Sequence, residues 1–408
     1  MKLQNIAIWA EEIPFKFAFK HALAERRSSS SIIVKATLDN GVCGWGEGVP
    51  RAYVTGETVA SCLAALRSRI VPRLLDVELS TPAALRSAMF DLHEDKATAG
   101  DLAALCAIEL ALLDALACSQ RKTMYALLGR ERRARAAAYS MVIGSSQRHA
   151  RNLSWLSRVL GINEIKIKVG STLEDDEQRA LAVKRAHPRA RLRIDANCAW
   201  TLDQARRCLD VLRPLGIVAC EQPLAKDDIA GHARLVAEYP DILICADESL
   251  CSFEDARLLA AERAFSCFNI RLSKNGGLFN ALRIHDLAKT AGIACQLGAQ
   301  VGETSILATA GRLFAGMTGD LRFHEGSFGT RLIKSDVVRR PIAFGFRGRA
   351  STRCRGWGWG VPADESRVAA YATGRVLLPD APLAGDDHRQ PWIPRKDDRA
   401  ALAVGSSL

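Results

Sequence analysis

The sequence lacks the features that mark membrane, secreted and disulfide-rich proteins. No apolar run approaches the length that crosses a bilayer, and residues 1–5 lack the charged-then-apolar layout of a secretory signal. The 12 cysteines include no Cys-x-x-Cys pair, and several lie in apolar runs, where cysteine behaves as a small buried hydrophobe. These absences predict a cytoplasmic protein that has no membrane partner and no disulfide framework.

The positive charge also lacks the pattern of a nucleic-acid-binding protein. The net charge is +11, but arginines are dispersed and no basic helix is interleaved with aromatic residues. We therefore expect no nucleic-acid partner, because an anionic small substrate would use the same positive field. Hydrophobic residues make up 48% of the chain, which is enough for the large core of a soluble globular protein.

Short apolar runs rich in β-branched residues recur along the middle of the chain, and most end in a polar or charged residue. Lys168, Asp195, Glu221, Asp247 and Lys274 are separated by 27, 26, 26 and 27 positions, the length that a strand, a helix and two loops need. Eight such runs predict a closed parallel barrel, and no clear helix follows the eighth. The predicted fold class is α/β, a (β/α)7β modified TIM barrel with strands at 138–142, 164–168, 192–195, 217–221, 242–247, 268–274, 293–297 and 321–325.

The first part of the chain has a different pattern. Residues 31–38 and 41–46 read as antiparallel strands joined by the turn Asp39-Asn40-Gly41, and helical patterns follow at 58–69 and 101–118. This predicts a separate α+β domain over 1–125, with the barrel at 126–335. Beyond Asp336 the pattern changes again, and 361–372 favours a helix. The Pro-, Asp- and Arg-rich end predicts a poorly ordered tail over 373–408.

Asp195, Glu221 and Asp247 end three successive predicted strands, so we expect their carboxylates to converge over the barrel mouth. Three hard oxygen ligands with open positions suit Mg²⁺ or Mn²⁺. Three carboxylates buried together without a cation would be very costly. The alternative for each residue alone is a helix cap or an arginine partner.

Lys166 and Lys168 lie two apart on one strand and therefore point to the same face. Neighbouring ammonium groups lower each other's pKa, which suits a lysine to act as a general base near neutral pH. Lys274 ends the sixth predicted strand, on the opposite wall of the barrel, where a second base would address the other face of one substrate carbon. The alternative is that these lysines are solvated residues at strand ends.

Together these segments resemble the enolase superfamily, specifically its muconate-lactonizing-enzyme subgroup, over roughly residues 1–372. Any single motif is weakly specific, but the ordered set at barrel spacing is strongly specific. The matching segments are Gly44-Trp45-Gly46-Glu47-Gly48, Tyr53-Val54-Thr55-Gly56-Glu57, Lys166-Ile167-Lys168, Asp195-Ala196-Asn197, Glu221-Gln222-Pro223, Asp247-Glu248-Ser249 and Lys274-Asn275-Gly276-Gly277.

The resemblance implies a capping domain built from both chain ends, with 336–372 returning to it. It implies Mg²⁺ held by the three carboxylates, a substrate carboxylate bound to the metal with Lys166 assisting, and Lys168 and Lys274 as the acid/base pair. The expected chemistry is removal of the proton α to a carboxylate, because metal coordination stabilises the resulting enediolate. Relatives of this kind often form homo-oligomers.

The eighth strand end helps to divide the reactions of the subgroup. Dipeptide epimerases carry an Asp-x-Asp pair there, whereas this chain has His324-Glu325-Gly326. Glu325 resembles the single acid of the cycloisomerases, although it could hold a substrate ammonium or pair with Lys274. We predict a Mg-dependent isomerase, either a racemase/epimerase or a cycloisomerase. A syn-dehydratase and a non-catalytic barrel stay open as alternatives.

Substrate choice is expected to come from the cap and from the loops after the strands. Arg26, with Arg27, precedes the first cap strand and would pair with a distal anion of a small carboxylate substrate, unless it is a solvated loop charge. Tyr53 would belong to a lid loop. Asn197 and Glu325 complete the predicted substrate-binding set.

Overall fold

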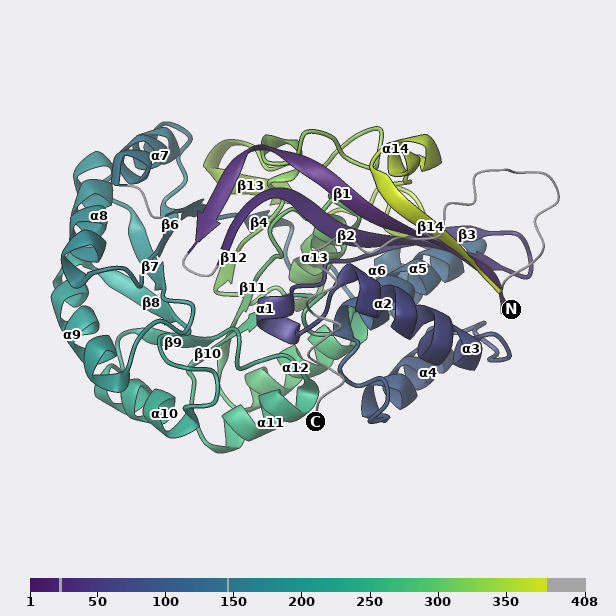
Figure 1. Cartoon of the computed structure of the whole chain (residues 1–408), viewed down its shortest axis with the longest axis horizontal. Coiled ribbons are helices and arrows are strands. Elements are labelled where there is room, and N and C mark those ends of the chain that lie inside the picture. Colours follow the sequence, from purple (N-terminus) through teal and green to yellow (C-terminus); the bar gives the residue numbers. More distant parts are fainter. Residues whose placement is uncertain (22–23, 145–146, 380–408) are drawn as a thin grey trace.

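The computed structural model of the chain describes residues 1–21, 24–144 and 147–379. One part is a ring of helices around short strands, and beside it lies a long twisted antiparallel sheet with helices packed below it (Figure 1). The predicted tail beyond Pro379 lies outside the described residues.

Eight parallel strands form the barrel, in the order β12-β11-β10-β9-β8-β7-β6-β5. The two edges of this sheet meet through a parallel bridge between Tyr139 and His324, where Ser140 N donates to the His324 carbonyl at 2.8 Å. The eight-stranded ring confirms the predicted sheet. The strands are β5 Met141–Ile143, β6 Glu164–Lys168, β7 Arg191–Asp195, β8 Ile217–Glu221, β9 Leu243–Ala246, β10 Cys267–Ile270, β11 Ala294–Leu297 and β12 Phe323–His324.

An α-helix follows each barrel strand except the last, so the (β/α)7β architecture is confirmed. Local capping explains where several of these helices begin: the Thr172 side chain accepts from Asp175 N, and acidic residues fill the first turn of α8. The helices are α7 Gln147–Val159, α8 Leu173–Ala186, α9 Leu202–Leu212, α10 Ile229–Glu238, α11 Phe253–Ala261, α12 Leu278–Thr290 and α13 Ser305–Thr318. Short 3-10 turns lie at Arg213–Leu215, Gly329–Arg331 and Phe346–Gly348.

The cap is a four-stranded antiparallel sheet, β14-β1-β2-β3, built from both ends of the described chain. The predicted hairpin is present, with Leu38 and Val42 hydrogen-bonded across the turn and φ of +78° at Gly41. Its strands are β1 Leu3–His21, β2 Ala24–Leu38, β3 Cys43–Gly48 and β14 Ala372–Leu378. Its helices are α1 Ala52–Thr55, α2 Val59–Ala65, a π-helical turn Leu66–Ile70, α3 Val71–Leu74, α4 Pro82–Glu94, α5 Leu102–Ser119 and α6 Met124–Leu128.

The carboxyl-terminal return differs from the prediction. The helix expected over 361–372 is only the short α14, Glu365–Ala369, and the residues expected to start a disordered tail form β14 instead. β14 pairs antiparallel with β1, with Ile6 opposite Leu378, so the return to the cap extends to Leu378. A partner strand compensates for the weak apolar signal of this segment. A two-stranded sheet of β4 Ala136–Ala138 and β13 Arg349–Ser351 lies where the chain passes between the two parts.

The cap core depends on three glycines of β3 that pack against α5. A Cβ added to Gly44, Gly46 or Gly48 would lie within about 2 Å of an α5 backbone atom. The α5 residues beneath them are alanines four apart. Two residues of strand rise about 6.6 Å and four residues of helix rise about 6.0 Å, so the two small-residue rows match along their length. The alanines are Ala103, Ala107, Ala111 and Ala115.

Helix α5 corrects one prediction made from the sequence. It is 18 residues long, with a mean hydropathy of 2.0, so by length and composition it could cross a membrane. In the structure, 89% of it is buried, which is typical of the core helix of a soluble protein. The apolar run had been judged too short because Asp101, Glu109 and Asp114 interrupt it or stand at its start.

The same helix anchors the cap to the barrel. Glu109 of α5 accepts hydrogen bonds from Leu278 N at 2.5 Å and Phe279 N at 3.1 Å, at the start of α12. Gly277 has φ of +124°, and a Cβ there would lie 2.5 Å from the Glu109 carboxylate. The glycine pair of the Lys274-Asn275-Gly276-Gly277 motif therefore lets the cap approach the barrel closely.

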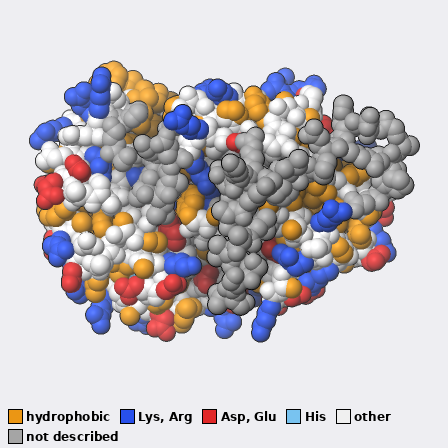
Figure 2. Space-filling view, viewed as in Figure 1, with side chains coloured by type: hydrophobic (Ala, Val, Ile, Leu, Met, Phe, Trp, Pro, Cys, Tyr) orange, Lys and Arg blue, Asp and Glu red, His pale blue; other side chains and the backbone are white. Residues whose placement is uncertain are grey.

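On the face shown in Figure 2, lysines and arginines are scattered among aspartates and glutamates rather than gathered in one stripe. This agrees with the dispersed arginines of the sequence.

Candidate functional site

The predicted charged residues lie together at the carboxyl ends of the barrel strands. Lys168, Asp195 and Glu221 are the last residues of β6, β7 and β8, and Asp247 directly follows β9. Strand register places Lys168 beside Asp195 and Asp195 beside Glu221. The 26–27-residue spacing in the sequence thus becomes a row of neighbouring side chains at one end of the barrel.

The two lysines of β6 are both held by carboxylates, but they differ in exposure. Lys168 Nζ donates to Asp195 Oδ2 at 2.5 Å and to Asn197 Oδ1 at 2.8 Å, and its side chain is 12% exposed. Lys166 is fully buried and contacts Glu221 at 3.1 Å, Asp195 at 3.2 Å and Glu325 at 2.8 Å. Lys168 is therefore the lysine of this pair that reaches the mouth.

The predicted lowering of the lysine pKa does not apply to Lys166. Burial by itself lowers the pKa of Lys166, but the carboxylates of Glu221, Glu325 and Asp195 raise it above its ordinary value. For Asp195, burial favours the neutral form, while Lys168 and Lys166 bring its pKa below the ordinary range. Lys166 is thus an ammonium that donates hydrogen bonds.

Lys274 does not occupy the place that the sequence suggested. The strand β10 ends at Ile270, and Lys274 lies in the turn beyond it with a fully buried side chain. Its Nζ donates to the Asp247 carbonyl at 2.7 Å, to Asp247 Oδ1 at 2.8 Å and to the Asn269 carbonyl at 3.0 Å. These three acceptors match the three protons of an ammonium. The structure gives Lys274 the surroundings of a residue that supports Asp247.

Arg271, which the sequence analysis did not single out, faces the carboxylates from β10. Its Nη2 contacts Asp247 Oδ2 and lies 3.4 Å from Glu221 Oε1, and its Nη1 lies 3.4 Å from Gln300 Oε1. Asn269, two positions earlier, donates from Nδ2 to Glu221 at 3.0 Å and to Asp247 at 3.1 Å. The alternation of strand side chains already relates Asn269 and Arg271 to one face, which is the signal that could have found them.

Glu325 joins this network, but not through Lys274 as one alternative proposed. Its carboxylate contacts Lys166 Nζ at 2.8 Å and Arg193 Nη1 at 2.8 Å, and it is buried. Gln296 of β11 links the two sides, because its Nε2 donates to Glu221 at 2.7 Å and its Oε1 accepts from Arg193 at 2.8 Å. Arg193 and Gln296 were also missed as members of the site.

The carboxylates do not meet at one point in this structure. In the chain from 1 to 379, apart from 22–23 and 145–146, no three His, Cys, Asp or Glu side chains lie close enough to hold a metal ion. Asp195, Glu221 and Asp247 stand side by side, each contacted by a lysine or an arginine. The expected convergence is therefore not present, and the alternative of cationic partners describes this arrangement.

The donor set nevertheless fits a hard divalent cation. Three carboxylates occupy adjacent strand ends, and a fourth, Glu248, lies beside them with its Oε2 buried and without a hydrogen-bond donor. Burial, followed by the charges of Asp247 and Asp195, raises the pKa of Glu248 to about 7. A cation near Asp195 and Asp247 would offset this excess of buried negative charge.

The predicted substrate-binding residues are placed as follows. Asn197 has φ of +46°, and its amide joins Lys168 to Glu248, to which its Nδ2 donates at 3.0 Å. Arg26 belongs to β2 of the cap, with its guanidinium carbon 5.5 Å from the centre of the Tyr53 ring. Tyr53 lies in α1, so the second predicted lid segment is a short helix.

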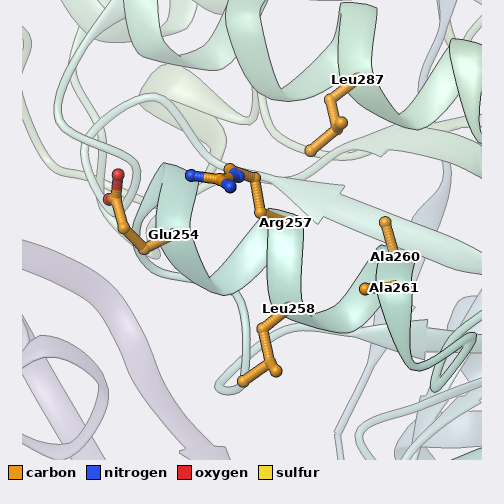
Figure 3. Close-up of a pocket in the computed structure, with 6 residues that line it drawn as sticks. All are labelled: Glu254, Arg257, Leu258, Ala260, Ala261 and Leu287. Carbon is orange, nitrogen blue, oxygen red and sulfur yellow. The ribbon is translucent and has the colours of Figure 1, made fainter.

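A shallow surface hollow between α11 and α12 is a separate feature (Figure 3). It contains none of the predicted site residues and lies on the outer helices of the ring. Its lining residues are Glu254, Arg257, Leu258, Ala260, Ala261 and Leu287.

Comparisons with known proteins agree with this arrangement. The model for "Mandelate racemase / muconate lactonizing enzyme, N-terminal domain" matches residues 4–129, and the model for "Enolase C-terminal domain-like" matches residues 150–367. The chain is 32% identical to the hydrophobic dipeptide epimerase of Enterococcus faecalis, over 76% of this chain and 86% of that relative. It is 30% identical to muconate cycloisomerase 1 of Pseudomonas putida, over 86% and 93% of the two chains.

Among solved structures, the N-succinyl Arg/Lys racemase of Bacillus cereus superposes with a TM-score of 0.84. The alignment covers 93% of this chain and 100% of that one at 24% identity, which shows a shared fold.

Proposed function

Since this chain belongs to the mandelate racemase/muconate lactonizing enzyme family of the enolase superfamily, we propose that it removes the proton α to a carboxylate with Lys168 as the base. The relatives are epimerases, racemases and cycloisomerases, so the chain is an enzyme, an isomerase of this kind. Metal dependence and the roles of individual residues are our proposal.

The observation that carries the proposal is the position of Lys168. It is the partly exposed lysine of the strand-end row, and Asp195 and Asn197 fix its ammonium in place. A proton α to a carboxylate is very weakly acidic, so its removal needs an oriented base and strong stabilisation of the charge that forms. Lys168 accepts this proton, and the buried ammonium of Lys166 donates a hydrogen bond to the substrate carboxylate.

We assign the cofactor as Mg²⁺, with Mn²⁺ as the alternative, held by Asp195, Glu221 and Asp247. Such a cation supplies positive charge that stabilises the carboxylate as the α-proton leaves. The residues around this position then have separate tasks: Asn269 and Gln296 orient Glu221, while Lys274 orients Asp247.

The substrate in this proposal is a small carboxylate, and the protein acts in the cytoplasm without a nucleic-acid or membrane partner. Arg26 and Tyr53 of the cap would contact the far end of the substrate, and Glu325 would contact it from the barrel. We also propose a homo-oligomer. Trp155, Val159 and Phe346 are each more than half exposed, and an apolar group is visible near α7 in Figure 2, which supports burial against another copy.

The test is proton exchange in D2O, followed by proton NMR in the presence of Mg²⁺. The probes are enantiopure N-acylamino acids, dipeptides, cis,cis-muconate and hydroxy acids. We expect exchange or turnover with at least one of them, and a loss of about 10²–10⁴-fold in Lys168→Met. Lys289→Met, an exposed lysine of α12, is the matched control and should keep full activity. Equal activity of Lys168→Met and wild type would refute the role of Lys168.

A further inference from the structure

The wall of the barrel opposite Lys168 carries an arginine. In the ring order, β6 and β10 are separated by four of eight strands, so they face each other across the mouth. Lys168 contacts Asp195 on one side, and Arg271 contacts Asp247 and Glu221 on the other. The row of carboxylates therefore lies between a lysine and an arginine.

Inversion at the α-carbon needs two groups that exchange protons, one on each face of the carbon. Arginine remains protonated in proteins, so Arg271 cannot accept a proton from a substrate. It can bind an anion through its planar fork of donors. Lys274, the other cation of this wall, has all three ammonium protons engaged by oxygens of Asp247 and Asn269 and is fully buried.

We infer that this chain is a one-base enzyme, in which Lys168 moves the proton on one face of the substrate and Arg271 binds a second carboxylate of the substrate on the other side. This inference rests on the proposed function and narrows it from racemisation to cycloisomerisation. The substrate class is a dicarboxylate whose second carboxylate adds to, or leaves from, the carbon next to the α-carbon.

The electrons and atoms of this reaction balance without a co-reactant. In the ring-opening direction, Lys168 takes the α-proton and the C–H electron pair becomes the Cα–Cβ double bond. The Cβ–O bond breaks, and its electron pair leaves on the oxygen, which becomes a carboxylate beside Arg271. In the ring-closing direction, the carboxylate oxygen adds to Cβ and Lys168 returns a proton to the α-carbon.

The experiment uses the full chain with Mg²⁺ in D2O, with cis,cis-muconate and both enantiomers of N-acylamino acids and dipeptides as probes. We expect lactone formed from muconate to carry deuterium on one face of the α-carbon, and no conversion of either enantiomer of any amino-acid probe into the other. Inversion of any amino-acid probe by the wild type would overturn the inference while leaving the proposed function standing. Absence of exchange and turnover with every probe would overturn both.

Two variants of Arg271 separate its role from a structural one. Arg271→Gln should raise the KM for muconate about 10-fold or more, while kcat falls less, because the anion contact is lost. Arg271→Lys should introduce slow inversion of amino-acid probes, since it places a second lysine opposite Lys168. Arg257→Lys in the outer hollow (Figure 3) is the matched control and should change neither property. An unchanged KM in a folded Arg271→Gln protein, checked by circular dichroism, would overturn the inference.

Discussion

Replacement of Gly46 by alanine should destabilise the cap strongly, because β3 and α5 touch through their backbones. The added Cβ would lie 2.0 Å from the Ala107 carbonyl oxygen and 2.6 Å from Ala111 N. Ordinary contacts between heavy atoms need about 3.5 Å, so strand and helix would have to separate by about 1.5 Å. Neither neighbour is the movable end of a side chain.

The magnitude follows from the kind of contact. Overpacking of a buried site costs about 1–3 kcal/mol, and two backbone segments that cannot rotate away place Gly46→Ala near about 3 kcal/mol. For a domain of this size, that corresponds to a fall in Tm of roughly 6–12 °C. The neighbouring Glu47 accepts from Thr304 N at 2.9 Å and Leu307 N at 3.0 Å, so movement of β3 would also loosen α13 of the barrel.

The assay is thermal and urea unfolding, with Gly100→Ala as the control. Gly100 has no atom within 4 Å of an added Cβ and does not have a positive φ, so that change should be neutral or slightly stabilising. A Gly46→Ala protein within about 0.5 kcal/mol of Gly100→Ala would refute the packing argument.

Three further predictions concern charge and metal. Burial raises the pKa of Glu109 to about 8 in the folded protein, so the native state keeps a proton that the unfolded chain loses above its ordinary value of 4.5. The free energy of unfolding should fall as pH rises from 4.5 to 8, and Glu109→Gln should flatten this slope by up to about 1.4 kcal/mol per pH unit in urea titrations. Saturating Mg²⁺, at about 100 times its Kd, should stabilise the wild type by about 2.7 kcal/mol in thermal unfolding, and Asp247→Asn should lose most of this gain; an equal gain in both would contradict the assigned ligand. Lys274→Met should destabilise the protein by about 3–5 kcal/mol, because it leaves Asp247 buried beside a missing partner, and unchanged stability would contradict the structural role.

The barrel and the strand-end row were predictable because their causes are local. Alternating apolar runs and helical patterns repeat at the length of one βα unit, and parallel strands bring their carboxyl ends to one side. Lys168, Asp195 and Glu221 lie at the ends of the strands that the sequence predicted. The β2–β3 hairpin was likewise visible in Asp39-Asn40-Gly41, whose turn needs a positive φ.

The errors arose where a tertiary partner decides the structure. The segment 372–378 has too weak an apolar pattern to predict a strand, and it forms β14 because β1 offers an open edge. The apolar run of α5 was not recognised as a single long helix, because the partners that satisfy Glu109 and Asp114 come from distant segments: α12 for Glu109, and Trp45 and Trp359 for Asp114. Such partners cannot be read from neighbours in the chain.

The sequence by itself determined which strands end in charged residues, and therefore the family, the barrel and the lysine of β6. Only the tertiary structure decided how those charges pair. β10 ends four residues before Lys274, which turns that lysine beneath Asp247 and leaves Arg271 facing the carboxylates. The physical reason is that a spacing in sequence specifies an order around the barrel, whereas the direction of a side chain depends on where its strand stops.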